Sequence, residues 1–261
     1  MKLFSVLSAL LLTFPSLSTS QQSAAPAPQA ATLLAQSAAA LTGRVALTDV
    51  TLSGTVRRIA GSDDESGTAV LTAISSGSSK LALTFPSGNR NEVRTNSSSG
   101  PAGSWSGHDG VAHPISYHNL MTDSGLFPAF ALASLLASQN TVATYVGQET
   151  RNGASVIHIS AYQQVSGITG EAAALPQRLS QIEIFLDPTT FLPASIAFKT
   201  HPDSNALLDI PIEVDFSDYR IVNGVQLPFH IQKSLNNSLL LDLQFQSVLV
   251  NTGLSASSFS L

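Results

Sequence analysis

Alternating apolar and polar residues run through most of the chain after residue 45. In the stretch 45–59, the apolar side chains of Val50, Leu52 and Val56 fall on one face and polar side chains on the other, which is the two-residue period of a β-strand. A strand of this length is unusual, and Gly54 within it predicts a bend or a bulge. The pattern therefore indicates a sheet with one apolar face.

Short polar connections separate the later alternating stretches. The predicted strands of the first half cover 45–59, 68–74, 80–85 and 89–95, and those of the second half cover 141–149, 154–162, 182–186, 194–199, 210–220, 227–231 and 239–245. Strands joined in this way form an antiparallel meander. The charges of Arg90, Glu92 and Arg94 are expected on a solvated face. Polar and small residues predict an acidic turn over 61–67 and loops over 96–107 and 163–176.

The dipeptide Asn223-Gly224 is the clearest turn signal. Both central positions of a type I′ turn need a positive φ, which Asn and Gly tolerate best. A second turn at Asn236-Asn237 leads into the last strand. A slip of one residue would expose the apolar side chains of these strands, so their register is well specified.

Two segments follow a helical period instead. The first covers 30–41 and ends before Gly43. The second covers 119–138, and its apolar surface is too wide for a helix that faces solvent. Its apolar stretch from Leu126 to Leu136 is either a movable lid over an acyl-chain cavity or a helix that permanently fills the concave face of the sheet.

Nine to eleven strands with two helices and no βαβ alternation predict a mainly β (α+β) fold. The expected architecture is one large curved antiparallel sheet, an incomplete barrel, covered by one or two helices.

The first twenty residues have the pattern of a signal peptide, with a positive charge at Lys2, an apolar stretch and small residues before position 20. Residues 21–30 predict a linker and 31–261 a single half-barrel domain. No apolar run reaches the roughly 18 residues that a transmembrane helix needs. We therefore expect a protein exported to the periplasm that does not span the membrane.

Composition narrows the partners. Cysteine is absent, which excludes disulfides, thiolate metal ligands, a cysteine nucleophile and the lipid-modified cysteine of a lipoprotein. Without Lys2, the net charge is 11 − 17 = −6. The chain is therefore not expected to bind nucleic acid, because a phosphate backbone requires a positive face.

Candidate metal chemistry is limited to one cluster of histidines. His108, His113 and His118 recur at five-residue intervals beside Asp109. Zinc sites usually show helical or tight-turn spacing, so ordinary hydrogen bonding is the preferred interpretation. We expect neither a metal nor a cofactor.

Candidate catalytic groups are also sparse. The stretch GSWSG at 103–107 has the letters of a nucleophile elbow, but no buried strand precedes it. Glu213 and Asp215 lie two residues apart on a predicted solvent face, whereas a glycosidase pair would need a shared cleft. No constellation of residues predicts an enzyme.

Three stretches of the C-terminal third carry a family resemblance. They are FLDPTTFLP at 185–193, VDFSDYRIVNGVQLP at 214–228, and 248–259 with its NTGL at 251–254. Together they resemble the outer-membrane lipoprotein carrier (LolA-like) superfamily. The resemblance implies an incomplete barrel whose concave face holds acyl chains beneath helices, and it carries over no binding residue.

These observations lead to two functional hypotheses. The first is a non-enzymatic periplasmic protein that binds a lipid or lipoprotein acyl chain in its half-barrel. The alternative is an envelope protein-interaction or stress-sensing module that uses the same sheet as a packed scaffold. The candidate ligand-binding residues are apolar side chains of the lid segment and of the predicted third strand: Leu126, Phe127, Phe130, Leu135, Leu83 and Phe85.

Overall fold

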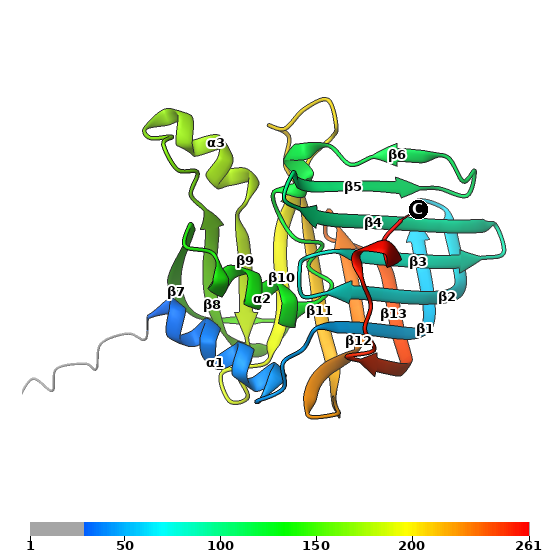
Figure 1. The fold of residues 1–261 in the computed structure, drawn as a ribbon, viewed down its shortest axis with the longest axis horizontal. Helices are drawn as coiled ribbons and strands as arrows, with labels where there is room; N and C mark the ends of the chain where they lie inside the picture. Colours follow the sequence, from blue (N-terminus) through cyan, green and yellow to red (C-terminus); the bar gives the residue numbers. More distant parts are fainter. Residues whose placement is uncertain (1–28, 261) are drawn as a thin grey trace, which may run out of the picture.

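A single curved sheet dominates the computed structural model, which describes residues 29–260. Its thirteen strands are antiparallel and do not close into a barrel (Figure 1). The predicted fold class is therefore confirmed. The predicted signal peptide (1–20) and most of the predicted linker (21–28) lie outside the described residues.

The strands fall into two groups along the chain. The first group is β1 (Asp49–Ala60), β2 (Asp63–Ile74), β3 (Ser79–Phe85), β4 (Gly88–Ser97), β5 (Gly100–Ser106) and β6 (Ala112–Pro114). The second group is β7 (Thr141–Arg151), β8 (Ala154–Gln163), β9 (Ile182–Leu186), β10 (Pro193–Thr200), β11 (Ile210–Val222), β12 (Val225–Leu235) and β13 (Ser238–Val250). The helices are α1 (Ala30–Thr42), α2 (Pro128–Ala137) and α3 (Glu171–Leu179), with short 3-10 turns η1 (Tyr117–Leu120) and η2 (Ala256–Ser258).

The order of the strands makes the sheet two meanders joined at one ladder. The order is β6-β5-β4-β3-β2-β1-β13-β12-β11-β10-β9-β8-β7. Every pairing joins strands adjacent in sequence except that of β1 with β13. The open edges are β6 and β7, and the segment that connects them carries η1 and α2.

The predicted bulge is present opposite Gly54, and its extra residue, Gln246, belongs to β13. The register of β1 against β13 shifts between Ser53 and Gly54. A Cβ atom on Gly54 would lie 2.1 Å from the carbonyl oxygen of Gln244. The glycine is therefore required where the two backbones approach each other closely.

Both predicted hairpin turns are present. Asn223 and Gly224 have φ values of 50° and 86°, and they join β11 to β12. Asn236 and Asn237, with φ values of 50° and 61°, join β12 to β13. These left-handed conformations are those that Asn and Gly adopt most readily.

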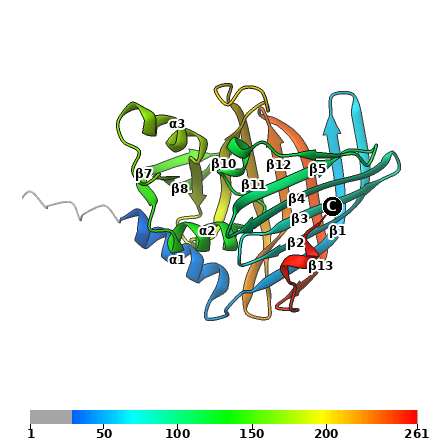
Figure 2. The ribbon, with the colours of Figure 1, turned by 45° about the horizontal axis from the view of Figure 1, so that its top comes forward.

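The core lies on the concave face of the sheet. One row of directly paired residues, Val214, Ile196, Ile184 and Ile159, crosses from β11 to β8 with each residue fully buried. Helices α1 and α2 pack against each other and lie across this face, as both views in Figures 1 and 2 show. Helix α3 stands apart from them, beside β8 (Figure 1).

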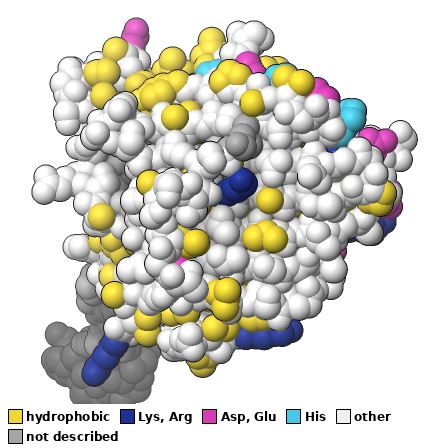
Figure 3. Space-filling view, turned by 45° about the vertical axis from the view of Figure 1, so that its right-hand side comes forward, with side chains coloured by type: hydrophobic (Ala, Val, Ile, Leu, Met, Phe, Trp, Pro, Cys, Tyr) yellow, Lys and Arg dark blue, Asp and Glu magenta, His cyan; other side chains and the backbone are white. Residues whose placement is uncertain are grey.

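The C-terminal segment covers part of the outer face. After β13 the chain passes back over β2 and β4, where Phe259 packs against Ile74 and Val93. At the start of this segment, the carboxylate of Asp49 accepts hydrogen bonds from the backbone amides of Thr252 (2.7 Å) and Gly253 (3.0 Å). Figure 3 shows the right-hand side of Figure 1, where charged side chains are few.

Two predicted connections are strands instead. The acidic stretch 61–67 is mostly part of β2, because only Gly61 and Ser62 form the turn. The Ser- and Gly-rich stretch 96–107 contains the end of β4 and all of β5. Ladder hydrogen bonds from neighbouring strands stabilise an extended backbone there despite its low strand propensity.

Three other predictions need correction. The predicted loop 163–176 contains the first six residues of α3, and the predicted helix 119–138 is shorter and begins at Pro128. Arg90 and Glu92 do not lie on the outer face of the sheet, because they pair with Leu83 and Leu81 and share the concave face with them. Val93 faces outward, beneath Phe259.

Candidate functional site

The segment before α2 enters the concave face through a tight turn. The carboxylate of Asp123 accepts a hydrogen bond from the backbone amide of Gly125 (2.9 Å), and Gly125 has a φ of +72°. Pro128 is then the first residue of α2, where its fixed φ suits a helix start. From Leu126 to Leu132 every residue is buried. This lid segment, residues 126–137, is thus anchored at its N-terminal end.

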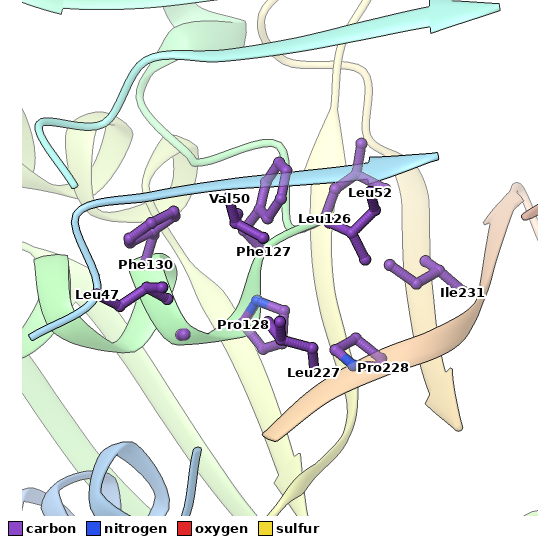
Figure 4. A pocket seen from close by; sticks show the side chains of 11 residues that line it. Leu47, Val50, Leu52, Leu126, Phe127, Pro128, Phe130, Leu227, Pro228 and Ile231 are labelled. Carbon is purple, nitrogen blue, oxygen red and sulfur yellow. The ribbon is translucent and has the colours of Figure 1, made fainter. Parts of the chain in front are cut away.

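An apolar pocket lies between the lid segment, β1 and β12 (Figure 4). It is lined by carbon-rich side chains only: Leu47, Val50, Leu52, Leu126, Phe127, Pro128, Ala129, Phe130, Leu227, Pro228 and Ile231. Its volume is about 10 Å³, which is roughly the space of one water molecule. The lid segment therefore nearly fills this part of the half-barrel.

Half of the predicted ligand-binding residues line this pocket. Leu126, Phe127 and Phe130 do so, as Figure 4 shows. The other three predicted residues lie elsewhere: Leu83 and Phe85 are buried on the concave face, and Leu135 is partly buried against the same core. Sequence reasoning did not assign the walls from β1 and β12 to the site. Their inward alternation was visible, but the β1–β13–β12 pairing that brings them together was not.

Charged side chains occupy a different part of the concave face. The guanidinium of Arg94 donates to Glu92 (2.7 Å) and to the backbone carbonyls of Asn119 and Thr122 (3.1 Å each). Lys233 on β12 completes this group, which we call the inner ionic cluster: Glu92, Arg94 and Lys233. Burial opposes the ionisation of Glu92, but the charges of Arg94 and Lys233 outweigh it and lower its pKa to about 2.

The three histidines considered as a possible metal site, His108, His113 and His118, do not form one cluster. His113 stacks on Trp105 with ring centroids 4.5 Å apart, whereas His118 lies edge-on to His201 at 5.8 Å. Within residues 29–260, no group of three His, Cys, Asp or Glu side chains could hold a metal ion. The Trp105–His113 pair joins β5 to β6.

A polar groove of about 490 Å³ lies on the outer face over β9, β10 and β11, between the tips of two hairpins. Arg151 from one hairpin makes a 2.6 Å ion pair with Glu213 in this groove. Asp215 lies beside them on the outer face. Burial and the negative charge of Glu213 raise the pKa of Asp215 to about 6, although the positive charge of Arg151 opposes this shift. Asp215 is thus not the fully solvated charge that the sequence predicted.

Replacing Asp215 with asparagine is expected to stabilise the protein above pH 6. The pKa of Asp215 is raised from 3.8 to about 6, so the folded state holds the proton more tightly and the ionised form destabilises it. We expect Asp215→Asn to gain about 1 to 3 kcal/mol at pH 8, a gain that shrinks as pH falls from 6 towards 4. Urea unfolding at pH 4, 6 and 8 measures this, and a pH-independent difference would contradict it.

In the described part of the chain, no helix has the length and apolar character needed to cross a membrane. No protein-family model and no curated protein matches the sequence. Solved structures do match the fold.

Three structural relatives illustrate the likeness. A domain described as an outer-membrane lipoprotein-sorting protein, from Vibrio parahaemolyticus, is 13% identical with a TM-score of 0.54, over 88% of this chain and 95% of its own. A DUF1329 family protein from Desulfovibrio piger is 10% identical with a TM-score of 0.56, over 88% and 95%. A LolA superfamily protein from Nitrosomonas europaea is 11% identical with a TM-score of 0.55, over 90% and 99%.

The likeness extends far beyond the C-terminal third, to which the sequence motifs had confined it. At 10–13% identity the shared property is the path of the backbone. The chain shares its fold with a LolA superfamily protein over about 90% of its length.

Proposed function

We propose that this is a non-enzymatic periplasmic protein that binds an acyl chain of a lipid or lipoprotein between the concave face of its sheet and the lid segment. The observation that carries the proposal is the wholly apolar lining of the pocket beneath α2. An acyl chain needs no polar partner, and each methylene buried contributes roughly 0.8 kcal/mol.

Binding requires the lid segment to move. A volume of about 10 Å³ does not admit an acyl chain. The apolar side chains of α2 and the acyl chain therefore compete for the same surface of the sheet. The composition of α2 fits this exchange, because Phe130 and Leu132 face the core while Ala133 and Leu136 are exposed. A bound acyl chain would replace the apolar contacts between α2 and the sheet with its own apolar contacts.

The small volume of the pocket also supports a second function. Because the pocket is nearly filled, the sheet also suits a packed scaffold that binds an envelope protein through its surface. The two functions differ in whether the interior ever receives a ligand. Lipid binding therefore distinguishes them.

The direct test uses protein that has been unfolded, extracted with organic solvent and refolded, which the absence of cysteine simplifies. We expect cis-parinaric acid, whose fluorescence rises in an apolar site, to bind with a one-to-one stoichiometry. Native mass spectrometry of protein purified from periplasm should show a bound lipid. Absence of both signals would reject lipid binding and favour the scaffold.

Filling the pocket should block binding. Ala129 lines the pocket and is 6% exposed, so Ala129→Trp places an indole where the acyl chain would lie. We expect affinity for the probe to fall at least about tenfold. Ala133→Trp is the matched control, because Ala133 lies on the exposed side of the same helix.

Equal affinity of the two tryptophan variants would contradict the location of the site. Circular dichroism melting checks that each variant folds. Ala129→Leu, a smaller change, replaces Ala129→Trp if the larger side chain prevents folding.

A further inference from the structure

The inner face of β12 changes character along its length. Leu227, Phe229 and Ile231 are at most 7% exposed and belong to the core. Lys233 is the next residue with the same orientation, about 7 Å farther along the strand. The strand thus presents an apolar stripe that ends in a cation.

The pairing of Lys233 fixes its direction. Lys233 lies directly opposite Val214 on β11 and Leu241 on β13. Both partners are buried in the core, at 0% and 6% exposure. Directly opposed residues of an antiparallel ladder share one face of the sheet, so Lys233 faces the concave side.

The ammonium group of Lys233 makes no direct contact with a polar partner in residues 29–260. Among residues 29–260, no acceptor lies within hydrogen-bonding distance and no carboxylate within 4.0 Å of it. Glu92 is the acid whose charge acts on Lys233, but its carboxylate already accepts a 2.7 Å hydrogen bond from Arg94. Burial lowers the pKa of Lys233, an effect that Glu92 opposes and Arg94 reinforces.

Arg94, unlike Lys233, donates hydrogen bonds to several neighbouring groups. Its guanidinium is shared between Glu92 and the carbonyls of Asn119 and Thr122. A partly buried cation without a direct partner costs free energy that an anionic ligand can recover. Solvent reaches this region, since 27% of the Glu92 side chain is exposed, so a head group can enter.

We infer that Lys233 binds the anionic head group of a single-chain amphiphile whose tail occupies the apolar pocket. The inference rests on the proposed function and adds the class of ligand. Ile231 lines the pocket, and Lys233 follows it by two residues, so tail and head group would lie in contact with one strand. A carboxylate and a phosphate monoester both have the required charge.

The test compares two probes with the same tail, cis-parinaric acid and its uncharged methyl ester. We expect wild-type protein to bind the acid about tenfold more tightly than the ester. Lys233→Met should remove this preference by weakening the acid about tenfold and leaving the ester within twofold. Lys233→Arg should retain it.

Lys80→Met is the control, because Lys80 pairs with the outward-facing Val93 and donates to the carbonyl of Ser260. Displacement of the probe by tetradecanoate and by tetradecyl phosphate shows which head group is preferred. If tetradecanoate or tetradecyl phosphate displaces the probe less readily from Lys233→Met than from wild-type protein, the result supports the inference.

The outcomes separate the two proposals. If neither probe binds wild-type protein, the proposed acyl-chain function fails. If both probes bind but Lys233→Met keeps the preference for the acid, only the head-group site is overturned. Melting temperatures confirm folding, and we expect Lys233→Met to fold because an apolar side chain replaces a cation among buried neighbours.

Discussion

Replacing Gly54 with valine should prevent stable folding. The first atom of any side chain at this position would lie 2.1 Å from the carbonyl oxygen of Gln244 and 2.6 Å from the Cα of Phe245. Both are backbone atoms of β13, so the clash is relieved only by separating β1 from β13. Overpacking commonly costs about 1–3 kcal/mol, and a backbone clash at the joining ladder should exceed that range.

Gly107→Ala is the matched control for this prediction. A Cβ at Gly107 would meet nothing closer than 3.4 Å, where it contacts an Asp109 side-chain oxygen. We expect Gly107→Ala to change stability by less than about 0.5 kcal/mol. Urea unfolding followed by circular dichroism measures both, and a Gly54→Val protein as stable as Gly107→Ala would contradict the bulge geometry.

Asp49→Ala should cost about 3 kcal/mol and release the C-terminal segment. Asp49 is 1% exposed, and its carboxylate accepts hydrogen bonds from Thr48, Thr252 and Gly253. Alanine would leave these donors without their acceptor. Amide hydrogen exchange should accelerate over residues 252–260, whereas exchange in β7 and β8 should change little.

The contribution of Asp49 should also depend on pH. Burial raises its pKa, but the hydrogen bonds from Thr252, Gly253 and Thr48 outweigh burial, and the net shift is downward. A lowered pKa adds stability that is present above about pH 4 and is lost as pH falls through the folded-state value. The difference between wild type and Asp49→Ala should therefore narrow below pH 4.

Asp109→Ala serves as the control, since Asp109 is exposed and its carboxylate accepts a hydrogen bond from the backbone amide of Val111, two residues away. Unchanged hydrogen exchange over residues 252–260 in Asp49→Ala would show that the segment is held by Phe259 instead.

The sheet was largely predictable because its signals are local. Alternation placed most strands, and the pairs Asn223-Gly224 and Asn236-Asn237 placed two turns. Even the bulge at Gly54 followed from strand length and a glycine. Each of these signals lies within a few residues and depends on the geometry of one strand or turn.

The errors arose where tertiary contacts override local pattern. The sequence predicts a solvated face for the charged residues Arg90, Glu92 and Arg94, which alternate with Val93. In the fold Val93 faces outward and is covered by Phe259, some 165 residues later in the chain. The charges of Arg90, Glu92 and Arg94 consequently lie on the concave face.

The candidate site was predictable in part for the same reason. The width of the apolar surface on the lid segment identified Leu126, Phe127 and Phe130. The facing wall comes from strands whose adjacency is set by long-range pairing. Lys233, by contrast, was predictable from the sequence as an inward-facing residue. It follows Phe229 and Ile231 at the two-residue spacing of one face of a strand.

The single long-range ladder also determines how this chain must fold. Val50 pairs with Val250, two hundred residues later, whereas all other strand pairs are joined through short or moderate connections. Closing a loop of that length costs roughly 5 kcal/mol in chain entropy, so both meanders should form before β1 meets β13. The lone tryptophan, Trp105 in β5, lies in the first meander. Its fluorescence should therefore change in an early kinetic phase, ahead of the slower phase that completes the sheet.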